Sequence, residues 1–126
     1  MSVKFSVIER GNPLQPQHPK KWYANAKSTG DTTLRALGKE IAARSTVSPA
    51  DTQAVLVALT EVLVEHLANG RIVRLGDFGA FQVSLSSAGS VTETGFNASL
   101  IKGSKVIFRP GIDIREMQNN LKYEKI

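Results

Sequence analysis

The chain has 126 residues, with 16 Lys or Arg, 11 Asp or Glu, a formal charge of +5 and no cysteine. This length fits one domain, or one domain with an appendage, and the missing cysteine excludes disulfides and thiolate metal sites. The positive charge favours a polyanionic partner, and it lies at both ends. Residues 1–31 carry +3 (five basic, two acidic), residues 32–70 carry −1 (three against four) and residues 71–126 carry +3 (eight against five).

The first 31 residues are expected to form a β-strand extension, separate from a domain that covers residues 32–126. Val3, Phe5 and Val7 alternate with polar residues, which predicts a half-buried strand. Residues 11–19 contain three prolines and are expected to form an irregular loop. Residues 20–26 are then expected to be a second strand that pairs with the first.

A short helix is predicted next, ending near Arg44. Either Thr32 or Thr33 is placed to cap its first turn. Its apolar residues recur at i, i+3 and i+7, the spacing of one helix face: Leu34, Leu37 and Ile41.

A longer helix is predicted from Pro49 to about Ala68. Ser48 can cap it, Asp51 completes a capping box, and Gly70 follows its end as a left-handed stop. Its apolar residues lie on two faces. One stripe is Val55, Leu59, Val62 and His66; the other is Leu56, Leu63 and Leu67, widened by Val57 and Val64. A surface helix needs one stripe, so either a second subunit or the N-terminal strands are expected to cover the other.

After this helix the apolar period becomes two, which predicts strands over residues 72–75 and 80–85. Between them, Gly76 and Gly79 can supply the positive φ that a tight turn requires. The enclosed D-F-G would mark a magnesium loop in a protein kinase, but the other kinase motifs are absent. A G-x-x-G clamp on nucleic acid would join two helices, whereas this one joins two strands. The turn is therefore expected to be structural, with Phe78 buried at its apex.

Residues 86–100 are small and polar, which predicts a projecting excursion without a core pattern. Residues 105–109 form the next predicted strand, with Val106 and Phe108 facing inward. A short C-terminal helix is expected to start between residues 111 and 113, and the tail, residues 122–126, is expected to fray.

The chain resembles the HU/IHF family of bacterial histone-like DNA-binding proteins in three features. These are the order of elements from residue 32, the stretch V-R-L-G-D-F-G-A-F-Q-V, and the F-R-P-G before the last helix. The resemblance covers residues 32–122 and is greatest to the longer, HU-like variant with an N-terminal extension. It implies an α+β, IHF-like DNA-binding fold. Such a fold has a two-helix body, a three-stranded antiparallel sheet with an arm, a short C-terminal helix, and an intertwined homodimer with a basic β-saddle.

The arm departs from the family pattern. Family arms usually carry several Lys or Arg and a proline that wedges between base pairs. Here residues 86–100 have no Lys or Arg, contain Glu93, and include no proline. Apolar side chains can also intercalate, so Phe96 is either a replacement wedge or a side chain that packs back on the sheet.

The resulting expectation is an architectural, largely sequence-independent binder of double-stranded DNA in the cytoplasm, within the bacterial nucleoid. The alternative is an HU-like structural or protein-interaction module with weak or no DNA binding, which the uncharged arm favours. Catalysis, a cofactor, a metal site, a small-molecule substrate, a signal peptide and a membrane span are not expected, because the sequence holds none of their patterns. The residues expected to contact phosphates are Arg71, Arg74, Lys102, Lys105 and Arg109, with Lys20 and Lys21 as a second patch.

Overall fold

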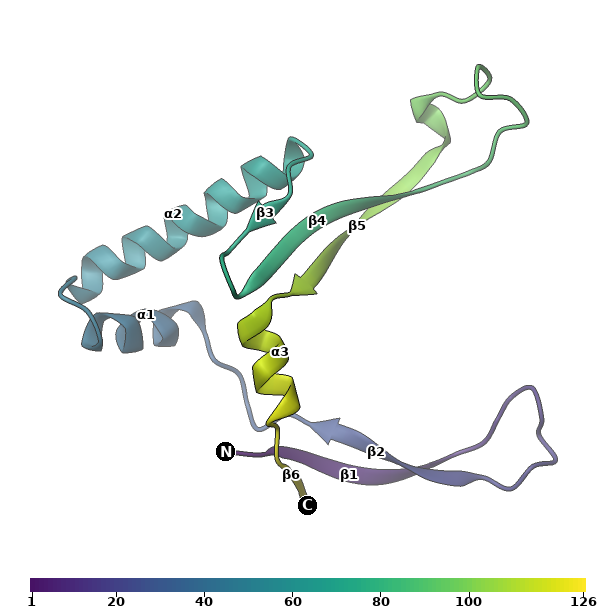
Figure 1. Cartoon of the computed structure of the whole chain (residues 1–126), viewed down its shortest axis with the longest axis horizontal. Helices are drawn as coiled ribbons and strands as arrows, with labels where there is room; N and C mark the ends of the chain where they lie inside the picture. Colours follow the sequence, from purple (N-terminus) through teal and green to yellow (C-terminus); the bar gives the residue numbers. More distant parts are fainter. The chain divides into compact units, whose positions relative to one another are not determined.

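A computed structural model describes all residues from 1 to 126 and divides the chain into two compact units (Figure 1). One unit contains Met1–Thr33 together with Met117–Ile126, and the other contains Leu34–Glu116. Residues 32–126 are expected from the sequence to form a single domain, whereas residues 117–126 belong to the same compact unit as the N-terminal strands. The reason is a strand pairing between the two ends of the chain.

The first unit is a three-stranded sheet in the order β2-β1-β6. Strand β1 (Val3–Arg10) pairs antiparallel with β2 (Lys21–Lys27), as expected, and parallel with β6 (Tyr123–Lys125). The expectation of a frayed tail is therefore wrong. The Val3 amide donates to the Lys122 carbonyl at 2.8 Å, and the Ile126 amide donates to the Phe5 carbonyl at 3.0 Å.

A side-chain ion pair adds to this attachment of the tail. The Lys4 ammonium donates to the Glu124 carboxylate, and the Ser2 hydroxyl donates to the same carboxylate at 3.0 Å. These two hydrogen bonds, chiefly the one from Lys4, lower the pKa of Glu124. Glu124 therefore stays ionised, and the pair persists, to more acid pH than an isolated glutamate would allow.

The second unit begins with two helices, α1 (Leu34–Ala43) and α2 (Pro49–Ala68). The predicted start of α2 is confirmed, because the Ser48 side chain accepts a hydrogen bond from the Asp51 amide at 3.1 Å. The two helices approach closely at Gly38, where an added Cβ would lie 2.0 Å from the Gln53 side-chain nitrogen. That nitrogen donates to the Arg35 carbonyl at 2.9 Å and ties α2 to α1.

The structure separates the two apolar stripes of α2. Leu56, Leu63 and Leu67 are half-buried within the chain, whereas Val55, Leu59 and Val62 are exposed. Val57 and Val64, which widen the predicted Leu56–Leu63–Leu67 stripe, are also exposed. The exposed stripe includes Val55 at 62 % exposure. No apolar residue anywhere in the chain is fully buried, so the chain by itself does not complete a hydrophobic core.

A three-stranded antiparallel sheet follows the helices, in the order β3-β4-β5. Strand β3 (Val73–Arg74) turns into β4 (Gly79–Ser87) through the predicted tight turn, with φ of +55° at Gly76 and +152° at Gly79. The prediction that Phe78 is buried is wrong, since 46 % of its surface is exposed. It packs instead against Phe108 of the third strand, with ring centroids 5.6 Å apart.

Strand β5 (Ile101–Pro110) is longer than predicted, because its pairing with β4 continues outward to form an arm that Figure 1 shows extending from the sheet. The end of the arm contains η1 (Ala98–Leu100) and short local hydrogen bonds, including one from the Gly95 amide to the Thr92 hydroxyl at 3.0 Å. Helix α3 (Ile112–Asn119) follows β5, and the predicted short C-terminal helix is confirmed. The division between the two units falls within α3.

Candidate nucleic-acid interface

The outward face of the β3–β4–β5 sheet carries basic residues from two different strands. Arg74 of β3 lies opposite Ala80 of β4, and Ala80 lies opposite Arg109 of β5. Residues directly opposite each other in a sheet point to the same face, so the two arginines flank Ala80 on one face. Lys105 lies opposite Ser84 on the same face, four residues from Arg109, because side chains alternate along a strand.

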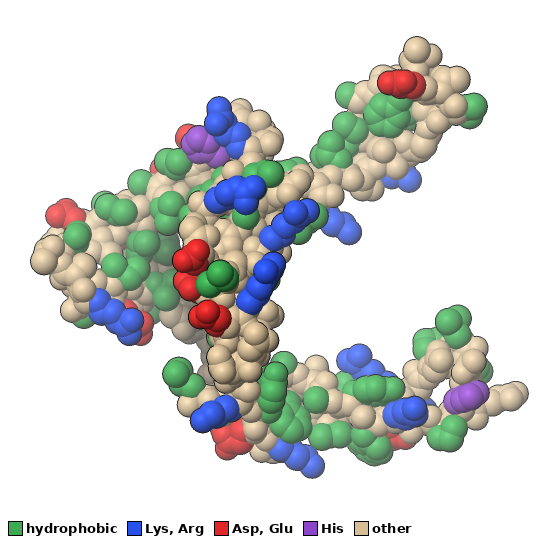
Figure 2. Space-filling model, in the orientation of Figure 1, with side chains coloured by type: hydrophobic (Ala, Val, Ile, Leu, Met, Phe, Trp, Pro, Cys, Tyr) green, Lys and Arg blue, Asp and Glu red, His purple; other side chains and the backbone are tan.

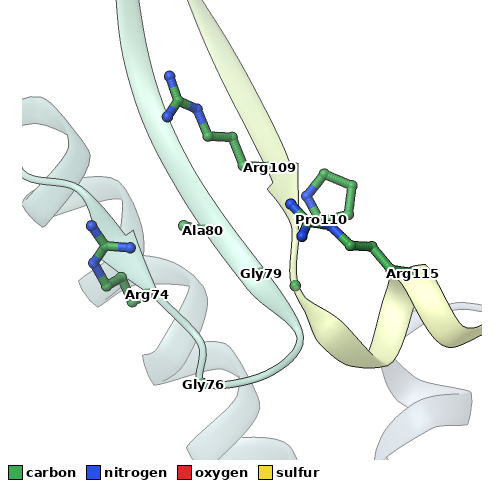
Figure 3. A pocket seen from close by; sticks show the side chains of 8 residues that line it. Arg74, Gly76, Gly79, Ala80, Arg109, Pro110 and Arg115 are labelled. Carbon is green, nitrogen blue, oxygen red and sulfur yellow. The ribbon is translucent and has the colours of Figure 1, made fainter.

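Helix α3 adds a third guanidinium to this group. Arg74, Arg109 and Arg115 line one hollow of about 260 Å³, together with small residues of the turn and of the end of β5 (Figure 3). Arg115 lies one helical turn after Gly111, and its amide donates a hydrogen bond to the Gly111 carbonyl at 3.0 Å. Arg115 is not among the phosphate-binding residues predicted from the sequence. The available signal was its position one turn into the helix that directly follows F-R-P-G.

Two glycines allow the turn, β5 and the start of α3 to approach one another closely. Gly79 is buried, and a Cβ on it would lie 2.5 Å from the Arg109 carbonyl oxygen. A Cβ on Gly111 would lie 2.3 Å from the Asp77 carbonyl oxygen. The turn, β5 and the start of α3 therefore meet backbone to backbone. This close approach brings the bases of the three arginine side chains, on three different elements, to a single hollow.

None of the three guanidinium groups forms an ion pair with a carboxylate. Guanidinium groups present planar N–H donors that match phosphate oxygens and can bind them bidentately. Three such groups around a hollow lined by small residues can therefore hold phosphate groups of a polyanion. The hollow contains no side chain that could serve as a nucleophile or a general base, since its other lining residues are Gly76, Gly79, Ala80, Pro110 and Gly111.

The other predicted phosphate-binding residues lie outside this hollow. Arg71 is exposed directly after α2, where its amide donates to the His66 carbonyl at 3.1 Å. Lys102 lies at a β-bulge of the arm, where Ser86 pairs with Gly103 and Ser87 with Ile101, so simple alternation does not apply to it. Lys20 and Lys21 belong to the N-terminal unit and are not among the residues that the sheet brings together.

Figure 2 shows most of the Lys and Arg side chains near the β4–β5 ribbon gathered over its base, one farther out along the arm, and an acidic side chain at the end of the arm. Phe96, in the same distal segment, is 41 % exposed. Its amide donates to the Glu93 carbonyl at 3.2 Å. The basic residues therefore lie on the paired part of the β4–β5 ribbon, whereas the segment beyond it, residues 88–100, has the acidic Glu93 as its one charged residue.

Two other kinds of site receive no support from the structure. No group of three or more His, Cys, Asp or Glu side chains is placed to hold a metal ion. No helix combines the length and the apolar character that crossing a membrane requires.

The profile of one protein family matches residues 1–125, and its description is an HU domain fused to a wHTH, Ig or glycine-rich motif (HU-HIG). The match includes the N-terminal strands as well as the helices and the arm. A similar fold occurs in the crystal structure of a Bacteroides vulgatus protein provisionally described as a bacterial DNA-binding protein, with a TM-score of 0.70 and 13% sequence identity. That likeness covers 99% of this chain and 48% of the other, so this chain spans about half the length of that protein. No curated protein sequence matches the chain.

Proposed function

Because the chain belongs to the HU-HIG family of HU domains fused to other motifs, we propose that it binds double-stranded DNA through the outward face of the β3–β4–β5 sheet. The observation that carries this proposal is the convergence of Arg74, Arg109 and Arg115 on one hollow without any carboxylate partner. Lys105 extends the same surface along β5. The description of the Bacteroides vulgatus protein as DNA-binding supports the choice of DNA as the polyanion.

The binding is expected to be largely independent of sequence. Hydrogen bonds from Arg and Lys to phosphates fix the position of a protein on the duplex but carry no sequence information. The affinity then comes mainly from counterions that the protein displaces from the DNA, and it falls steeply as salt is raised. We place the protein among the architectural binders of the bacterial nucleoid, with binding rather than catalysis as its activity.

We also propose that the protein acts as a homodimer. No apolar residue is fully buried, and the stripe of α2 formed by Val55, Leu59 and Val62 is exposed. A second copy that covers this stripe would complete the core that one chain lacks, and it would place two basic sheets in one particle.

A second candidate function is a structural or protein-interaction module that keeps the HU-like fold with little DNA binding. One specific observation favours it: the end of the arm has no basic residue and carries Glu93. The two functions differ in the salt dependence of duplex binding. A DNA binder has a steep negative slope of log K against log salt, whereas an interaction module binds duplex weakly at any salt concentration.

The deciding experiment is a salt titration of duplex affinity by fluorescence anisotropy with the double variant Arg74→Gln/Arg109→Gln. The matched control is Arg35→Gln/Lys39→Gln on α1, which removes the same charge from the helical body. The sheet variant is expected to lower the slope by roughly 1 for each phosphate that is no longer neutralised, and the control is expected to leave it unchanged. Equal slopes for both variants and the unmodified chain would show that the sheet does not hold the DNA.

A further inference from the structure

The two faces of the N-terminal β1–β2 hairpin differ in chemistry. The register places Phe5 opposite Ala26, Val7 opposite Ala24 and Glu9 opposite Trp22, so one face is mostly apolar. The other face carries basic residues at both ends of the hairpin. These are the cross-strand pairs Lys4–Lys27 and Arg10–Lys21, with Ile8–Tyr23 and Ser6–Asn25 between them.

Both basic pairs place like charges directly opposite each other, an arrangement that destabilises a sheet. At one end, Glu124 of β6 compensates by pairing with Lys4. At the other end, neither Arg10 nor Lys21 forms an ion pair with a carboxylate, and both are exposed. The fold therefore tolerates an uncompensated electrostatic cost at this end, and a bound anion would remove that cost.

The Arg10–Lys21 end also contains a hollow that suits an anion. It has a volume of about 170 Å³, and Arg10, Lys21, His18 and Tyr23 are among the residues that line it. Tyr23 is 49 % exposed, and its phenolic hydroxyl is a hydrogen-bond donor. Arg, Lys and Tyr side chains are common donors to the phosphates of DNA. The basic pairs at the two ends are six residues apart, or about 20 Å along the strand.

We propose that this basic face of the N-terminal hairpin, defined by Lys4, Arg10, Lys21, Tyr23 and Lys27, is a second surface that binds the phosphate backbone of double-stranded DNA. The inference of this second surface rests on the proposed function only in the choice of DNA as the ligand. Two basic pairs about 20 Å apart along the strand can contact phosphates several steps apart on one DNA strand, whose successive phosphates are about 3.4 Å apart along the axis. A membrane surface fits less well, because the apolar residues that would insert lie on the opposite face.

The test uses the full chain and the double variant Arg10→Gln/Lys21→Gln. Lys4 is left unchanged because it holds β6 through Glu124. The matched control is Lys122→Gln/Lys125→Gln, which removes two charges from the same unit; Lys125 lies opposite Phe5, on the apolar face. Duplexes of about 15 and about 40 base pairs are titrated by fluorescence anisotropy at several salt concentrations, beside the Arg74→Gln/Arg109→Gln sheet variant.

The hairpin variant is expected to lower the salt slope on the 40-base-pair duplex by about 1.8 and to weaken binding roughly ten- to a hundred-fold near 0.1 M salt, because two phosphates are no longer neutralised. The lysine control is expected to change neither quantity. A hairpin variant that binds like the unmodified chain, while the sheet variant is weakened, would overturn the second surface and leave the proposed function standing. The opposite result would overturn the sheet as the interface and support the hairpin. Equal weakening by the lysine control would also overturn the second surface, because net charge alone would then explain the weaker binding.

Discussion

The turn between β3 and β4 forms part of the hollow that Arg74, Arg109 and Arg115 line. The structure shows what a single added methyl group would cost in this turn. We expect Gly79→Ala to destabilise the protein strongly. Gly79 has a φ of +152°, a conformation that residues with a side chain rarely adopt. The added Cβ would also lie 2.5 Å from the Arg109 carbonyl oxygen and 2.6 Å from a ring carbon of Phe108.

Two costs combine at this position. Backbone strain in such a sparsely populated region costs about 1–3 kcal/mol. Overpacking against neighbours that cannot move away costs a further 1–3 kcal/mol or so, and here the nearest neighbour is a backbone atom of β5. The sum, about 2–6 kcal/mol, is a large fraction of the stability of a small domain. In a chain of this size it lowers the melting temperature by roughly 10 °C or more.

The matched control is Gly76→Ala in the same turn. Gly76 also has a positive φ, +55°, but no atom lies within 4 Å of its added Cβ. Only the left-handed strain of about 1–2 kcal/mol therefore applies to it. Both variants are unfolded in urea at the same protomer concentration and followed by far-UV circular dichroism, because an oligomer's stability depends on its concentration.

The free energy of unfolding is expected to fall in the order unmodified chain, Gly76→Ala, Gly79→Ala. A Gly79→Ala protein as stable as the Gly76→Ala protein would refute the reasoning, since the close approach of the turn to β5 would then cost nothing. Weaker duplex binding should accompany the lower stability in Gly79→Ala only, because the same close approach positions Arg109 beside the hollow.

Three further predictions concern other parts of the chain. Leu59 is exposed in the single chain, and Leu59→Asp would bury a charge at the proposed dimer interface. Light scattering should therefore show a 13.7 kDa monomer, whereas an unchanged dimer would place the interface elsewhere. Ser48→Ala removes the cap that accepts the Asp51 amide and should cost about 1 kcal/mol in urea unfolding. Phe96→Ala should leave duplex affinity and bend angle nearly unchanged, because the arm's end has no positive charge; a collapse of both quantities would identify Phe96 as a wedge.

The features predicted correctly from the sequence are local ones. The Ser48 cap depends on residues three apart, and the tight turn depends on two glycines three apart. The alternation of apolar residues predicted β1 and β4 because side chains on a strand follow a period of two. Each of these signals lies within a few residues of the structure that it specifies, so no knowledge of the rest of the chain was needed.

The tertiary structure decided what depends on distant segments. Strand β6 could not be predicted from residues 123–125 alone, because its hydrogen bonds go to β1, more than a hundred residues earlier. Phe78 is exposed because the only ring it packs on is Phe108, and one chain does not cover the rest. Basic residues are visible in the sequence, but only strand register and the close backbone approach at Gly111 bring Arg115 to the hollow that Arg74 and Arg109 line. Likewise, register alone places Arg10 opposite Lys21 on one face of the hairpin. Composition determined that this chain favours a polyanion, and the pairing of strands decided which of its cations lie close enough together to bind one.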